Sequence, residues 1–217
     1  PVDKYTFILV NLDSGERIDM SKQSSYTYTL PEGGTAHFTV EVTRLANSST
    51  QEVTKDYSLK PGWNLISVPV DPAVTSALAQ LGDNLDLFSV YQYHDGKFYN
   101  AGDADIQAGL GYWVYVKDNT HIDIKGLPAP PVTRVPLSQG WNAIGNPYEA
   151  ELMWNSSGIK FNCGAADMTP QQAAAAGATD GRLYEWTGEG YQPADRLVPW
   201  RGYFIKGTAG CELVISQ

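Results

Sequence analysis

Metal binding and acid–base catalysis depend mainly on histidine, cysteine and carboxylate side chains, and the three histidines of this chain are poorly placed for either. His37, His94 and His121 lie in different segments, and none belongs to an HxH or HExxH pattern or stands at a zinc-ligand spacing from a cysteine. The sequence also lacks GxSxG, a P-loop, and GxGxxG at the start of a helix. We therefore expect no catalytic residue, no metal ligand and no enzyme activity. A glycosidase-like carboxylate pair is the remaining enzymatic alternative.

Two acidic clusters are the other candidates for chemistry. Asp83 and Asp86 in one segment, and Asp103 and Asp105 in another, could bind calcium in an extracellular loop, because calcium prefers oxygen ligands. Nothing else in the sequence supports a calcium site. We expect solvated acidic turns and no cofactor.

Composition and charge exclude several classes of partner. The chain has 217 residues, with 15 Lys and Arg against 24 Asp and Glu, and a formal net charge of −9. Such a surface repels phosphate backbones and anionic lipids, so we expect no nucleic-acid partner. No run of about 18 apolar residues occurs, so we expect no membrane insertion. Thirteen Tyr, six Trp, 21 Gly and 13 Pro favour short strands with tight turns, and hence an all-β protein with short helices.

Cys163 and Cys211 are the two cysteines of the sequence. An even pair in an acidic, tyrosine-rich β protein predicts one disulfide and an oxidising compartment, with two buried thiols as the alternative. Cys163 lies in a segment that only the second half of the chain contains, and Cys211 lies in the last turn. A disulfide would tie this added segment to the closing strand.

The sequence contains an internal repeat, so the strands and turns of one half have counterparts in the other half. Trp63 and Trp141 are 78 residues apart, and each stands in a Gly-Trp-Asn block that continues with an aliphatic residue and a proline. Two further blocks follow in the same order, which indicates a duplicated unit of roughly 75 to 85 residues. The matched segments are 59–69 with 137–147, 90–102 with 183–195, and 111–116 with 202–207.

Local signals predict turns at the blocks. The asparagine after each tryptophan is expected to satisfy free backbone groups at the strand entrance. In the middle block, Asp95-Gly96 favours a two-residue hairpin turn that places Tyr93 opposite Phe98. Trp186 and Tyr191 have the same spacing in the second copy.

Each copy also predicts a short helix. In the first copy Asp71 is expected as the N-cap and Pro72 at the first helical position. In the second copy Thr169 and Pro170 have these roles, and Gly177 ends the helix.

The aromatic residues divide into matched and unmatched rings. The matched rings are expected in the core of the repeats, because both copies need them; they are Trp63, Trp141, Tyr93, Trp186, Tyr112 and Tyr203. The unmatched rings Tyr99, Trp154 and Trp200 are the candidates for binding a ligand by stacking on sugar faces. Packing between the two copies is the alternative role for these three.

The first fifty residues predict a different module. Three strand-like runs, at 4–20, 24–30 and 35–43, alternate strongly between apolar and polar residues. An immunoglobulin-like sandwich needs about seven strands, so three strands are an incomplete one. They are either the end of a domain or a set of strands that a partner completes. The expected order is a partial Ig-like segment at 1–45, a linker at 46–56, a first repeat at 57–128 and a second at 129–217.

The motifs resemble a known group of repeats. GWNLIS-P followed by GYWV is similar to tandem repeats near the C-termini of large secreted and cell-surface bacterial proteins. The N-terminal run resembles the closing strands of Ig-like or fibronectin-like modules that precede such repeats. The second copy departs from the pattern at Gly145, where the first has Ser67, and at Phe204, where the first has Trp113. The resemblance implies an extracellular or cell-surface location and an adhesive or scaffolding role, and it supplies no catalytic residues.

Three functional hypotheses follow. The leading one is a non-catalytic structural or interaction module of a larger exported protein. The second is a carbohydrate-binding accessory module for a polysaccharide, which requires an exposed row of coplanar rings. The third is a subunit whose N-terminal strands are completed by another chain, by strand addition or filament assembly. The expected partner is another protein chain or a missing N-terminal part of the parent protein, because three strands do not complete a sandwich.

Overall fold

The computed structural model describes residues 5–20, 22–23, 25–30, 33–44, 52–72, 81, 85, 90–100, 105–164 and 166–217. The chain divides into two compact units, Pro1–Thr50 and Gln51–Gln217. The described residues form several small antiparallel sheets and one short helix, so the protein is all-β, as the composition predicts. None of the described helices is long and apolar enough to cross a membrane.

The described residues of the first unit form one three-stranded sheet. Its strands are β1 (Tyr5–Asn11), β2 (Arg17–Asp19) and β3 (Phe38–Arg44), in the order β2-β1-β3. The predicted strand at 24–30 is wrong, because its described residues, 25–30, have no strand partner. Its side chains hold it instead.

Tyrosine rings replace strand pairing in this segment. Tyr26 and Tyr28 lie edge to face with Phe38, at centroid distances of 6.0 and 5.7 Å, and the Tyr26 hydroxyl donates to Glu16. The sheet buries Val10 but leaves large apolar side chains exposed on its strands and turns, namely Leu12, Met20, Phe38 and Val40. Three strands therefore leave apolar area uncovered, and the described residues of this unit include no second sheet.

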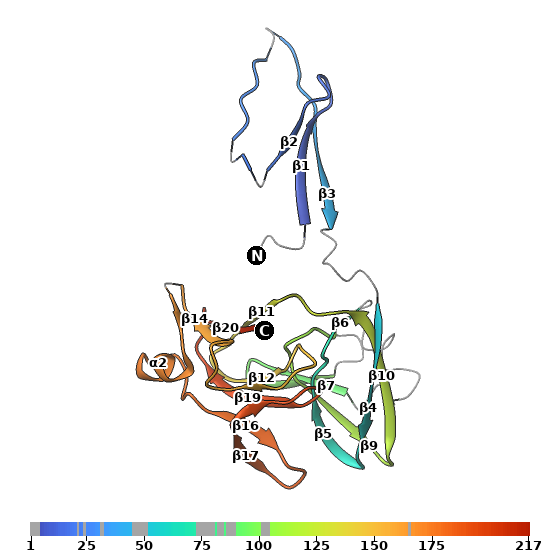
Figure 1. Ribbon diagram of the computed structural model, residues 1–217, viewed down its shortest axis with the longest axis vertical. Helices are drawn as coiled ribbons and strands as arrows, with labels where there is room; N and C mark the ends of the chain where they lie inside the picture. Colours follow the sequence, from blue (N-terminus) through green and yellow to red (C-terminus); the bar gives the residue numbers. More distant parts are fainter. Residues whose placement is uncertain are drawn as a thin grey trace. The chain divides into compact units, whose positions relative to one another are not determined.

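The first repeat of the larger unit builds two sheets (Figure 1). One has the order β4-β10-β6 and the other the order β5-β9-β7-β8. Their bounds are β4 Val53–Leu59, β5 Gly62–Ile66, β6 Asp71–Pro72, β7 Val90–His94, β8 Lys97–Asn100, β9 Tyr112–Val116 and β10 Thr120–Leu127.

The second repeat builds the same two sheets with additions. They have the orders β11-β20-β14-β15 and β12-β19-β16-β17, and a short pair β13-β18 accompanies them. The bounds are β11 Val132–Pro136, β12 Gly140–Gly145, β13 Leu152–Met153, β14 Ile159–Asn162, β15 Asp167–Met168, β16 Leu183–Trp186, β17 Tyr191–Ala194, β18 Arg196–Leu197, β19 Gly202–Gly207 and β20 Glu212–Ser216.

The strand registers of the two repeats coincide. In one sheet Trp63 lies opposite Tyr115, and 78 and 91 residues later Trp141 lies opposite Lys206. In the other sheet the pair Tyr57 and Ile122 recurs at the same offsets, as Val135 and Leu213. The sequence match is therefore a duplication of structure.

The repeats contact each other reciprocally, as expected for a pseudo-twofold pair. Ile66 of the first repeat forms a bridge with Arg201 of the second, and the equivalent Ile144 forms one with Leu110. Position 67 and its equivalent, 145, lie against each other between the repeats, because a Cβ added to Gly145 would be 1.9 Å from the Ser67 Cβ. Only one of the two positions has room for a side chain.

The local predictions have mixed outcomes. Asp95 and Gly96 form the expected hairpin turn with Tyr93 opposite Phe98, and Trp186 lies opposite Tyr191. Helix α2 (Pro170–Ala175) begins with the predicted Thr169 cap, whose hydroxyl accepts from the Gln172 backbone N–H.

Asp71 and Pro72 are not a helix start. They form β6 and pair with β10, so that the backbone of the first repeat uses these residues to extend a sheet. Leu81 is helical and buried, and the rest of that predicted helix lies outside the described residues. The linker prediction is also too long at its end, because β4 begins at Val53.

The predicted disulfide between Cys163 and Cys211 is confirmed. Cys163 directly follows β14 and Cys211 directly precedes β20. The bond therefore joins the segment added to the second repeat to its closing strand.

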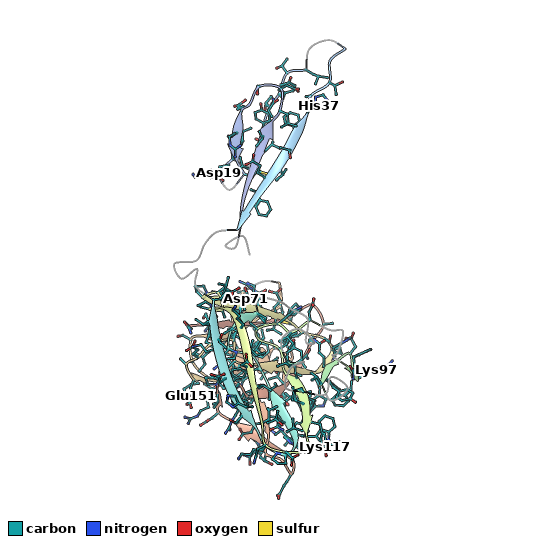
Figure 2. All side chains as sticks on the ribbon, turned by 90° about the vertical axis from the view of Figure 1, so that its right-hand side faces the viewer. Asp19, His37, Asp71, Lys97, Lys117 and Glu151 are labelled. Atoms are coloured by element: carbon teal, nitrogen blue, oxygen red, sulfur yellow. A yellow bond between two sulfur atoms is a disulfide. The ribbon has the colours of Figure 1, made fainter. Side chains whose placement is uncertain are left out.

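The sheet that contains the Gly-Trp-Asn strand of each repeat, β5 or β12, is called its GWN sheet. Each repeat has its own core on the inner face of this sheet. Side chains of the larger unit fill the space between its sheets (Figure 2). Tyr112 and Tyr203 are almost completely buried in these two cores, as predicted. Each phenol oxygen accepts a 2.8 Å hydrogen bond from a backbone N–H five residues earlier, of Gln107 and Val198 respectively.

These tyrosines predict a loss of stability in alkali. Burial raises the pKa of Tyr203 to about 12 from its ordinary value of 10, and it raises the pKa of Tyr112 as well. Above pH 10 the unfolded state therefore loses a phenol proton that the folded state keeps. The free energy of unfolding should fall by about 1.4 kcal/mol per pH unit for each tyrosine up to its folded pKa. Urea unfolding between pH 9 and pH 12 measures this slope. Tyr203→Phe should remove its share, and an identical slope in that variant would contradict the prediction.

Candidate functional site

The GWN turns direct the two tryptophans outward. Gly62 has a φ of 95° and its equivalent Gly140 one of 96°, a region that favours glycine. The Asn64 side chain accepts from the Lys60 N–H at 3.1 Å and donates to the Lys60 carbonyl at 2.7 Å. Asn142 makes the same two bonds to the turn before it. The asparagines therefore close the turns, as predicted.

Residues alternate between the two faces of each GWN strand. In β5, Ile66 enters the core of the first repeat, whereas Leu65 lies on the opposite face with Trp63. The expectation that Trp63 and Trp141 are core residues is wrong, because their exposed fractions are 45% and 37%. Duplication of these rings reflects a duplicated outer face rather than a duplicated core.

The outer faces of the two GWN sheets pack on one another through a third cluster. Leu65, Trp113, Ala143 and Phe204 are its buried members, two from each repeat. Tyr93 and Trp186, expected in the cores of their own repeats, are instead half-buried against this third cluster. Tyr93 lies 5.2 Å from Phe204 of the second repeat, and Trp186 lies 5.2 Å from Trp113 of the first.

Groove 1 opens beside this cluster. It is lined by six aromatic residues and has a volume of about 430 Å³. Trp186 contributes one wall of the groove from the second repeat, and its indole N–H donates to the Trp63 carbonyl at 3.1 Å. The lining residues are Trp63, Tyr91, Phe98, Trp113, Trp186 and Tyr191.

Groove 2 opens on the other side of the cluster and has a volume of about 360 Å³. Under the duplication, each of the six residues of groove 1 has its counterpart in groove 2. Groove 2 has one further lining residue, Lys206, whose Nζ lies 5.0 Å from the centroid of the Trp141 ring. The lining residues are Tyr93, Phe98, Trp141, Tyr184, Tyr191, Phe204 and Lys206.

Phe98 and Tyr191 belong to both grooves and join them into one aromatic surface. Both are more than half exposed, at 58% and 51%. Burial raises the pKa of the Tyr191 phenol, with a smaller effect from Tyr93, so Tyr191 stays neutral at physiological pH. The Trp113 indole N–H is buried and has no hydrogen-bond partner among the described residues, and the Trp113 ring lies edge to face with Trp63 and Trp186.

The three predicted binding rings lie outside the grooves. Trp154 and Trp200 are only 3% and 8% exposed, so the expectation that they present rings to a ligand is wrong. Trp154 donates its indole N–H to the Gly181 carbonyl within the second core. Trp200 stacks on Tyr57 in the core of the first repeat, which is the alternative role, packing between the copies.

Tyr99 is 40% exposed but lies away from the groove lining. It stacks on His94 with a centroid distance of 4.0 Å, and it pairs across the hairpin with Gln92. Phe98, its neighbour on the opposite strand face, lines the grooves instead.

Metal-ligating and catalytic side chains do not converge in the described part of the chain. Each histidine lies at the surface near one carboxylate: His37 near Asp13, His94 near Asp95, and His121 near Asp56. No group of three or more His, Cys, Asp or Glu side chains gathers among the described residues. Of the two acidic clusters, only Asp105 is described, and residues 83, 86 and 103 lie outside the described residues.

A third, polar hollow of about 450 Å³ lies over β16 to β19. Its two arginines are paired within the protein: Arg201 with Glu185 at 3.2 Å, and Arg196 with Asp195 at 2.9 Å and Glu151 at 3.2 Å. These ion pairs leave no uncompensated cation there for an anionic ligand.

Comparison of the chain with protein-family models, curated proteins and solved structures found no match. The site therefore stands on its own geometry. The sequence analysis missed the grooves because an aromatic residue that occurs in both repeats gives the same sequence pattern whether it is buried or lines a surface. One signal was present: the GWN strands carry apolar residues on both faces, as strands do when each face packs against something.

Proposed function

We propose that this protein is a non-catalytic interaction part of an exported protein, and that grooves 1 and 2 are its binding face. The observation that carries the proposal is the repetition of one set of rings around two open grooves. Exposed apolar clusters of this kind mark binding sites more often than scattered surface rings do.

The disulfide supports an oxidising, extracellular setting, in which such bonds persist. The first unit supports an interaction role as well, because the sheet that its described residues form leaves Phe38 and Val40 exposed. Further polypeptide, from the parent protein or from a partner, would cover this apolar area.

A flat polysaccharide fits the grooves less well. Stacking on a sugar chain needs coplanar rings, whereas neighbouring rings of the two grooves are inclined by 57° to 90°. Inclined rings form walls around a compact group rather than a platform. The geometry therefore favours a ligand that inserts into a groove over one that lies on it.

The test uses the full chain and three probes: choline, insoluble cellulose and a proline-rich peptide. At least one probe should bind saturably, and Trp63→Ala or Trp141→Ala should weaken that binding at least about tenfold, because each removes a ring wall. Tryptophan fluorescence measures the soluble probes and sedimentation measures cellulose.

Tyr99→Ala is the matched control, since it removes an equally exposed ring outside the grooves. It should leave binding unchanged. Absence of saturable binding to all three probes, or wild-type binding by both tryptophan variants, would overturn the proposal.

A further inference from the structure

Grooves 1 and 2 differ in charge at one pair of equivalent positions. In groove 2, Lys206 lies on the strand next to Trp141 and holds its ammonium group 5.0 Å from the ring centroid. In the first repeat the equivalent residue is Tyr115, which is not one of the six lining residues of groove 1 and whose ring lies 5.3 Å from Trp63. Groove 2 thus carries its own cation against its tryptophan, and groove 1 has none in that place.

The chemistry of groove 1 suits a cation. The described residues that line it are all aromatic, and the negative face of an aromatic ring attracts positive charge. Glu189 lies in the turn that joins Trp186 to Tyr191, and the whole chain has a net charge of −9. Both favour the approach of a cation over that of an anion.

The lining also decides what kind of cation fits. A primary ammonium carries three N–H donors, whereas the acceptors that the six lining side chains offer are the phenol oxygens of Tyr91 and Tyr191, with no carboxylate or amide. Lys206 avoids this cost because its ammonium stays exposed to water. A methylated ammonium has no such requirement once its N–H groups are replaced, and its methyl groups bury apolar area against the rings.

From this contrast between the two grooves, we propose that groove 1 binds a methylated ammonium group such as the trimethylammonium of choline. The inference rests on the proposed function of the grooves and specifies the ligand class. At about 430 Å³ the groove also admits part of the molecule that carries the group.

Choline and its neutral carbon analogue, 3,3-dimethylbutan-1-ol, separate cation binding from simple apolar burial. They have the same shape and differ in charge. Titration of the full chain, followed by tryptophan fluorescence, should show saturable binding of choline that is at least about tenfold tighter than that of the alcohol. Equal binding of the two, or no saturable binding of choline, would overturn the inference.

Exchanging the two differing residues should move the site. Tyr115→Lys places an internal cation beside Trp63 and should abolish choline binding, whereas Tyr115→Phe should retain it. In the double variant Tyr115→Lys/Lys206→Tyr, binding should return in groove 2. It should then be lost on Trp141→Ala, while in the wild type it is lost on Trp63→Ala.

Positions 115 and 206 are exposed, so these variants should fold, and circular dichroism checks that they do. Wild-type affinity in folded Tyr115→Lys, or a double variant that still depends on Trp63, would contradict the assignment to groove 1.

The trimethylammonium group occurs both in free choline and in lipid headgroups, and binding to vesicles distinguishes these two sources. Co-sedimentation with phosphatidylcholine vesicles that free choline reverses would identify a lipid headgroup, whereas binding of free choline alone would identify a soluble ligand. Loss of choline binding with retained, tryptophan-dependent binding of cellulose or the peptide would overturn this inference and leave the proposed function standing.

Discussion

Gly145→Ala should lower the free energy of unfolding by about 3 kcal/mol, at the upper end of the usual cost of overpacking a core. The new Cβ would lie 1.9 Å from the Ser67 Cβ and 3.1 Å from the Leu110 carbonyl oxygen. Ser67 is completely buried and its hydroxyl donates to the Arg201 carbonyl at 2.9 Å, so it cannot move aside. Urea unfolding followed by circular dichroism measures the loss.

The pseudo-twofold arrangement supplies a rescue for this variant. In Ser67→Gly/Gly145→Ser the side chain moves to the equivalent position, where the Leu110 carbonyl takes the place of the Arg201 carbonyl as acceptor. This swap should restore stability to within about 1 kcal/mol of the wild type, the scale of one hydrogen bond. Gly190→Ala is the control, because a Cβ there meets nothing within 4 Å. A swap no more stable than Gly145→Ala alone would refute the pseudo-twofold contact.

Removal of the disulfide should have a larger effect. Cys163 and Cys211 are 48 residues apart, and closing a loop of that length stabilises the folded state by about 4 kcal/mol in the chain-entropy model. Cys163→Ala/Cys211→Ala should therefore unfold at a much lower urea concentration than the wild type. Cys211 is also buried in the second core, so part of the loss will come from packing.

Reduction of the wild type separates these two contributions, since it breaks the bond and keeps both side chains. The reduced protein should lose most of the stability that the double variant loses. An unfolding midpoint that is the same with and without reductant would show that the bond contributes nothing.

Duplicated positions that have diverged carry the most information about this protein. Position 67 and its equivalent 145 share one space, so only one keeps a side chain. Trp200 is equivalent to Gly109 and has a φ of 69°, a backbone conformation that favours glycine. Stacking of its ring on Tyr57 in the other repeat offsets the cost of this conformation. Tyr115 and Lys206 differ at the grooves. Each divergence lies where the two repeats meet or where they open to solvent.

The sequence alone determined the all-β class, most of the local turns and the duplication. Turn residues and the alternation of apolar and polar residues act over short stretches of chain. The Asp95-Gly96 hairpin, the Thr169 cap and the hydrogen bonds of Asn64 to its turn were therefore predictable from the local sequence. The disulfide followed from cysteine count and composition. Asp71-Pro72 misled the same reasoning, because pairing with the distant β10 outweighed a good local helix start.

Only the tertiary structure decided which aromatic rings are buried. A strand exposes two faces, and its sequence does not say which face meets the core of its own repeat and which meets the other repeat. Trp63 and Trp141 are equivalent in the two repeats, yet they line grooves instead of the cores. Trp154 and Trp200 have no equivalent ring in the other repeat, yet they are buried. Burial is set by contacts between segments far apart in the chain, and the site of this protein exists only because two copies of one fold pack face to face.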